Sequence, residues 1–141
     1  MSDIGFTGTS SNVTARQALA LWRVMLKIEV GRGHHGDCIN ADALFDDMAR
    51  RLGWVRIAHP GHDGKGDSPH RAGCAADEIR SPLPYLVRNK AIVNEVGRLL
   101  ACPRGPEQQR GSGTWHTIRL AAKKGIPITI VWPDGTVEER G

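Results

Sequence analysis

Hydrophobic and polar residues alternate along this chain with two different periods. Short segments, most of them apolar, predict strands at residues 4–8, 34–38, 55–58, 98–102 and 126–132. Between them, apolar side chains recur every three or four positions, which predicts helices with one buried face at residues 15–30, 41–52, 84–96 and 114–124. The first helix has a candidate capping box, Thr14 with Gln17, and the second a candidate cap at Asn40.

This alternation predicts an α/β fold, with a parallel sheet covered by helices on both faces. We expect one doubly wound domain over residues 1–141, with about five strands in the order 3-2-1-4-5 and right-handed crossovers. Residues Ile4–Gly8 then form the central strand, and Ile126–Trp132 lies toward an edge. Ligands bind such sheets beyond the carboxyl ends of the strands, where the strand order reverses. Here that switch point lies between the first and fourth strands.

The least regular segment is a long loop at about residues 59–84, rich in glycine, proline and histidine. Loops of this length inside a compact domain are often functional. We expect one short helical turn within it, at residues 75–79. After Pro133 the chain is polar, and Asp134-Gly135 predicts a turn.

Composition limits the classes of protein to consider. The chain has 141 residues, of which 40% are apolar and 24% charged, as in globular domains. Its net charge of +4 suits a phosphate-bearing ligand, but the charges are scattered and aromatic residues are few, so nucleic acid is an unlikely partner. Three unpaired cysteines, no signal peptide and no apolar run of membrane-spanning length predict a cytoplasmic protein without a membrane partner.

Two small, hydroxyl-rich loops are expected at the switch point. Gly8-Thr9-Ser10-Ser11 ends the first strand, and Gly111-Ser112-Gly113-Thr114 opens the helix after the fourth. Such loops expose backbone N–H donors, and a helix N-terminus favours an anion. The pair therefore predicts a phosphate site, although each loop alone also fits an ordinary turn and helix cap. Neither is a Walker loop or a GxGxxG dinucleotide motif.

Several short motifs follow one another in a characteristic order: Gly5-Phe6-Thr7-Gly8-Thr9, His35-Gly36-Asp37-Cys38 followed by Ala41-Asp42, Tyr85-Leu86-Val87-Arg88-Asn89, Ser112-Gly113-Thr114-Trp115 and Ile130-Val131-Trp132-Pro133-Asp134-Gly135. The ordered set resembles the SLOG superfamily, a Rossmann-like group containing the LOG phosphoribohydrolases and the DNA-processing protein A family. The nearest resemblance is to its YspA/cpYpsA-related branch. That resemblance implies a nucleotide or ADP-ribose-derived ligand, including cyclic nucleotide signals of anti-phage defence. It also implies a homodimer or higher oligomer, of bacterial or phage origin.

The remaining candidates lie near the same crevice. Arg88 falls about one helical turn after Pro84, where its guanidinium can bind a phosphate bidentately, and Asn89 adjoins it. Asp37 can accept hydrogen bonds from ribose hydroxyls, act as a base, or shape a turn. Trp115 can stack on a base or pack in the core. The candidate ligand-binding residues are Gly8, Thr9, Ser10, Gly36, Asp37, Arg88, Asn89, Gly111, Ser112, Gly113, Thr114 and Trp115.

Catalysis is not expected, because Thr117 stands where the resembled LOG enzymes carry the glutamate of their PGGxGTxxE motif. A threonine cannot serve as a carboxylate base. The leading hypothesis is therefore a sensor or sequestering protein that binds without turnover. The alternatives are a nucleoside-5′-monophosphate N-glycosidase using Asp37, Arg88 and His116, and a single-stranded nucleic-acid binder. Asp42, in the first turn of its helix, needs no role beyond meeting the helix dipole.

A zinc site is a further alternative. Its four candidate ligands lie in or near the long loop, namely His59, His62, His70 and Cys74. Their spacing is looser than in most structural zinc sites. We therefore expect no metal and no cofactor, with the histidines near the pocket rim.

Overall fold

The computed structural model describes residues 3–29, 31–64, 66, 68–107 and 112–141. Its main sheet has seven strands in the order β5-β3-β2-β1-β7-β8-β9. They are β1 (Ile4–Gly8), β2 (Arg32–His35), β3 (Val55–Ala58), β5 (Glu78–Ile79), β7 (Arg98–Cys102), β8 (Ile128–Val131) and β9 (Val137–Arg140). All neighbouring strands pair in parallel except β8 and β9. The predicted order of five parallel strands is confirmed within this larger sheet, with β1 at its centre.

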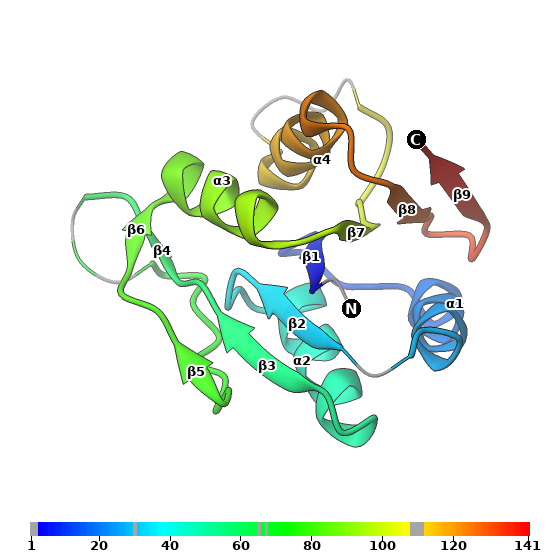
Figure 1. Cartoon of the computed structure of the whole chain (residues 1–141), viewed down its shortest axis with the longest axis horizontal. Coiled ribbons are helices and arrows are strands. Elements are labelled where there is room, and N and C mark those ends of the chain that lie inside the picture. Colours follow the sequence, from blue (N-terminus) through cyan, green and yellow to red (C-terminus); the bar gives the residue numbers. More distant parts are fainter. Residues whose placement is uncertain (1–2, 30, 65, 67, 108–111) are drawn as a thin grey trace.

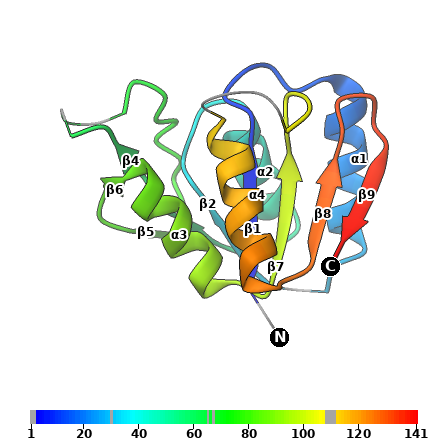
Figure 2. The same ribbon diagram turned by 90° about the horizontal axis from the view of Figure 1, so that it is seen from above.

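Two helices cover each face of the sheet (Figure 1, Figure 2). Helices α1 (Ala15–Leu26) and α2 (Ala41–Arg51) lie on one face, and α3 (Tyr85–Glu95) and α4 (Gly113–Lys124) on the other. Because successive strand residues point to opposite faces, Leu100 of β7 packs with the α1–α2 layer while Leu99 packs with the α3–α4 layer.

The core beneath α2 is aromatic. Phe6 of β1 stacks on Phe45 of α2, with ring centroids 4.6 Å apart, and Trp54 meets Phe45 edge to face. This packing holds the amino end of α2 close to the carboxyl end of β1. The backbone approach is so tight that a Cβ on Gly8 would lie 2.4 Å from the Cβ of Ala41.

The two predicted helix caps have different outcomes. Thr14 Oγ1 accepts a hydrogen bond from the Gln17 backbone N–H, as predicted. The Gln17 side chain does not complete a capping box, because its Nε2 donates to the carbonyls of Pro103 and Val131. Asn40 does not cap α2; it has a φ of +68° and its amide donates to the Ser10 carbonyl.

Both ends of the sheet differ from the prediction of five strands. The polar tail forms β9, which pairs antiparallel with β8 after the predicted turn at Asp134-Gly135. Residues Glu78–Ile79 form strand β5 beside β3, so a helical turn at 75–79 was wrong. The irregular segment also contains β4 (Gly61–His62) and β6 (Leu83–Pro84), paired as a small second sheet. In the part of the chain that is described, no helix has the length and apolar character to cross a membrane.

Candidate functional site

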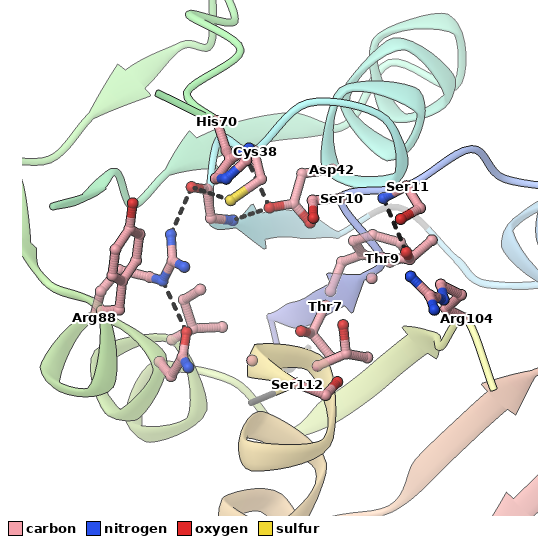
Figure 3. A pocket seen from close by; sticks show the side chains of 18 of the residues that line it. Thr7, Thr9, Ser10, Ser11, Cys38, Asp42, His70, Arg88, Arg104 and Ser112 are labelled. Atoms are coloured by element: carbon pink, nitrogen blue, oxygen red, sulfur yellow. Dashed lines mark hydrogen bonds between the residues drawn. The ribbon is translucent and has the colours of Figure 1, made fainter. Parts of the chain in front are cut away.

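A cavity of about 690 Å³ opens at the switch point between β1 and β7. Its walls come from β1, from the loops after β1, β2 and β7, from the first turns of α2 and α4, from α3, and from His70 of the long loop (Figure 3). Residues that sequence reasoning assigned to a ligand and that line the cavity are Gly8, Thr9, Ser10, Gly36, Arg88, Asn89, Ser112, Gly113 and Thr114. Gly111, assigned with them, lies outside the described residues.

One end of the cavity is rich in hydroxyl groups. Thr9 Oγ1 accepts a hydrogen bond from the Ser11 backbone N–H, 3.0 Å away, which folds the loop after β1 into a tight turn. Ser112 Oγ caps α4 by accepting from the Trp115 N–H at 3.3 Å, and Thr114 is buried next to it. The N-terminus of α4 therefore faces the cavity.

An arginine that sequence reasoning missed stands at this end. Arg104 is exposed, lines the cavity, and forms no hydrogen bond or ion pair with any described residue. Figure 3 shows its guanidinium beside Thr9, across the cavity from Arg88. Its position just past the carboxyl end of β7 was the available signal, but the polar loop around it gave no reason to single it out.

Arg88 is held differently from the bidentate phosphate contact expected for it. Its guanidinium is buried, and Nη1 donates to the carbonyls of Gly36, at 2.6 Å, and His59, at 3.0 Å. Its Nε donates to Asn89 Oδ1, and Cζ lies 5.7 Å from the centroid of the Tyr85 ring. Two of the three guanidinium nitrogens, Nε and Nη1, thus bond groups of the protein itself.

Glycine at position 36 makes this arrangement possible. A Cβ there would lie 2.5 Å from Nη1 and 2.8 Å from Cζ of Arg88. Any side chain would therefore displace the guanidinium from the carbonyls that it bridges. The glycine predicted to contact a ligand also sets the position of the arginine.

Asp37 does not line the cavity and instead holds the long loop. It is buried, with a φ of +54°. Its Oδ1 accepts from the Cys74 N–H at 2.8 Å, its Oδ2 from Arg71 Nε at 3.2 Å, and its carbonyl from the Ala72 N–H at 2.7 Å. The alternative that it shapes a turn fits this geometry better than a role as a base.

The next three residues of α4, Trp115, His116 and Thr117, do not line the cavity. Trp115 is 1% exposed, donates from Nε1 to the Gly105 carbonyl and packs against Trp132, so it serves the core. Thr117 is buried and its hydroxyl donates to the Gly113 carbonyl. His116 bonds Asn89 through Nδ1, and burial lowers its pKa.

Two further side chains line the cavity near Arg88. Asp42 is 4% exposed, and its Oδ2 accepts from the backbone N–H groups of Gly36 and Cys38 at 3.1 Å each. Burial raises the pKa of Asp42, and His35 and Arg88 oppose that rise. Burial also raises the pKa of the Cys38 thiol to about 11, so the thiol is neutral at physiological pH.

The four residues considered as zinc ligands are not assembled into one site. His70 lines the cavity, and His62 accepts from the Gly64 N–H. His59 pairs instead with His34, with 2.8 Å between their ring nitrogens, and Cys74 belongs to a separate group with His35 and Asp46.

The two possible metal-binding groups among the described residues are occupied by hydrogen bonds. His34 bonds Asp3 through Nε2 at 2.7 Å and His59 through Nδ1. In the other group, His35 bonds Asp46 through Nε2 and accepts from the Asp37 N–H through Nδ1. Each network is already satisfied by protein partners, so neither needs an ion to explain it.

Comparison with known proteins gives a fold and no family. No family model and no curated protein matches the chain. The molybdenum cofactor binding protein from the phototrophic bacterium Rippkaea orientalis superimposes with a TM-score of 0.69 at 19% identity, over 92% of this chain and 75% of the other. The structural genomics target TM1055 superimposes with a TM-score of 0.64 at 17% identity, over 91% of this chain and 72% of the other. The chain has a Rossmann-like α/β fold. At such low identity the likeness shows the fold alone.

Proposed function

We propose that this protein binds a phosphorylated, nucleotide-type small molecule in the cavity at the switch point, without turning it over. The observation that carries the proposal is the convergence of Ser112, Thr9 and Arg104 with the N-terminus of α4 on one cavity end. Hydroxyls, backbone N–H groups and a guanidinium that pairs with no described residue are suitable donors for a phosphate.

The size of the cavity supports a ligand larger than phosphate. Pockets for small molecules and cofactors span roughly 300–1,000 Å³, and about 690 Å³ falls within that range. Tyr85, which lines the cavity and contacts Arg88 at the end away from Arg104, offers apolar surface for a flat ring. A phosphate at Arg104 and a base toward Tyr85 would fill both ends.

The ordered motifs that resemble the SLOG superfamily favour a nucleotide or ADP-ribose derivative within this class. We assign the protein to that superfamily and, more finely, to its YspA/cpYpsA-related branch as part of the same proposal. Its role there is that of a cytoplasmic sensor or sequestering protein, assembled as a homo-oligomer.

Binding without turnover is supported by the positions of the candidate catalytic groups. Asp37 is engaged by Arg71 and Cys74, and neither Asp37 nor His116 lines the cavity. Thr117 is buried and supplies no carboxylate. The N-glycosidase alternative therefore lacks two of its three proposed residues at the site.

A second candidate ligand is a phosphorylated pterin. The neighbour from Rippkaea orientalis is described as a molybdenum cofactor binding protein. A pterin carrying a phosphate would present the same flat ring and anion as a nucleotide. The binding test below separates the two by including both.

The test is ligand binding by the purified chain and by an Arg104→Ala variant. Mass spectrometry after heat release identifies any retained ligand. Calorimetry then measures the binding of AMP, ADP-ribose, inorganic pyrophosphate and a phosphorylated pterin. Loss of one charged hydrogen bond costs about 1.5–3 kcal/mol, so Arg104→Ala should weaken the tightest ligand about tenfold or more.

Arg51→Ala is the matched control, because Arg51 is exposed on α2 and pairs only with Asp47 among the described residues. It should bind as the wild type does. Absence of binding to every phosphorylated probe refutes the proposal, and release of free base from AMP by the wild type replaces it with the enzyme alternative.

A further inference from the structure

One carboxylate oxygen at the cavity has no partner. Asp42 Oδ1 is shielded from solvent and forms no hydrogen bond, and no other described residue that is itself not exposed has such a buried side-chain atom. Its sister oxygen, Oδ2, accepts two backbone N–H groups and completes the turn after β2. A buried acceptor without a donor is costly, and the turn does not need Oδ1.

The neighbours of Asp42 do not supply the missing donor. Two nearby side chains bond other groups: Arg88 Nη1 donates to two carbonyls, and His35 bonds Asp46. The Asn40 amide donates to the Ser10 carbonyl. No donor among the described residues thus reaches Asp42 Oδ1.

The place of Asp42 in the cavity indicates which part of a ligand would face it. Asp42 lines the cavity beside Ser10 and Cys38, between Arg104 at one end and Arg88 at the other (Figure 3). If the phosphate lies at Arg104 and Ser112, the group next along a nucleotide is its sugar. Ribose offers two adjacent hydroxyl groups there, and each can donate a hydrogen bond to a carboxyl oxygen.

We propose that Asp42 Oδ1 accepts a hydrogen bond from the ribose hydroxyls of the ligand and thereby selects ribonucleotides over sugars that lack these hydroxyls. This inference rests on the proposed function, since it presumes a phosphorylated nucleotide in the cavity. It moves the sugar contact from Asp37, which the sequence offered as an acceptor for ribose hydroxyls, to Asp42, a residue of the Ala41-Asp42 motif for which a helix-dipole role was sufficient.

The experiment compares matched nucleotides on two variants. The four ribonucleoside 5′-monophosphates are measured by calorimetry with their 2′,3′-dideoxy counterparts, and inorganic pyrophosphate reports on the phosphate end alone. The wild type should bind the preferred ribonucleotide at least tenfold more tightly than its dideoxy counterpart. Asp42→Asn keeps one oxygen for the Gly36 and Cys38 N–H groups but presents an amide donor to the ligand.

In Asp42→Asn the preference for ribose should fall to about twofold or less, while pyrophosphate binds as it does to the wild type. Asp47→Asn, on the exposed face of the same helix, should keep the full preference. Equal affinity of the wild type for ribo- and dideoxynucleotides overturns the inference without any variant, and leaves the proposed function standing. A full preference retained in Asp42→Asn also overturns it. Failure of the wild type to bind any nucleotide overturns both proposals together.

Discussion

A buried histidine behind the cavity makes folding sensitive to acid. Burial, assisted by His34, lowers the pKa of His59 to about 3, whereas an unfolded histidine titrates near pH 6.5. Between these values the unfolded chain binds a proton that the folded chain does not. The stability that His59 contributes is therefore present above pH 6.5 and lost as the pH falls toward 3.

Urea denaturation at several pH values between 7 and 5 tests this expectation. His59 should contribute a slope approaching about 1.4 kcal/mol per pH unit below its unfolded pKa. His59→Asn removes the titrating ring, so the free energy of unfolding of this variant should depend less on pH. An unchanged slope in His59→Asn would show that other groups cause the acid sensitivity.

Residue types alone did not separate the two aspartates near the site. Asp37 and Asp42 both follow β2, but Asp37 adopts a φ of +54° and bonds the loop at Arg71 and Cys74. Asp42, on the first turn of α2, lines the cavity. Which of the two aspartates lines the cavity depends on where residues 71–74 lie in the fold. No local sequence pattern determines that position. The glycines and hydroxyl residues at strand ends could be predicted as site residues, because the topology itself brings strand ends to the switch point.

At the scale of elements, the contact between β1 and α2 tolerates no added atom. Gly8→Ala would place a Cβ 2.4 Å from the Cβ of Ala41. Overpacking of this kind costs roughly 1–3 kcal/mol. Thermal or urea denaturation should show that loss, and adding Ala41→Gly should recover part of it.

Gly113→Ala is the control for that substitution. Gly113 lines the same cavity, yet a Cβ there meets nothing within 4 Å. The free energy of unfolding of Gly113→Ala should stay within about 0.5 kcal/mol of the wild-type value, as for other unconstrained sites. If Gly8→Ala is as stable as Gly113→Ala, the packing of α2 on β1 is looser than described.

The elements that sequence patterns predicted are those with strong apolar periodicity. Strands β1, β7 and β8 and helices α1, α2 and α4 carry such patterns, and the strand order followed from topology rules. Strands β5 and β9 are short and mostly exposed, with little hydrophobic alternation. They exist because a neighbouring strand offers unpaired backbone groups, which is a property of the assembled sheet.

For the molecule as a whole, β9 covers the edge of β8, which would otherwise be free to pair with another chain. All four residues of β8 are buried, and β9 pairs along its full length. Deleting residues 136–141 would leave this apolar strand with free backbone donors and acceptors, which templates association between chains. The truncated chain should unfold at lower temperature and form larger species in light scattering.

Full-length Glu139→Gln serves as the comparison, because it removes one charge from β9 and keeps the backbone pairing. It should stay as dispersed as the wild type. If the truncated chain forms no larger species and unfolds at the same temperature as the wild type, pairing with β9 is not what keeps β8 from associating. The homo-oligomer implied by the family resemblance stays a separate prediction.

The neutral thiol on the cavity wall has a consequence for chemical damage. Oxidants and electrophiles attack the thiolate form of cysteine, and burial raises the pKa of Cys38 to about 11 and that of Cys74 to about 12. Cys102, fully buried in β7, is shifted upward as well. Sulfur atoms near the cavity are thus slow to form sulfenic acid or adducts. A protein that holds a ligand during oxidative stress would keep its binding surface chemically unchanged.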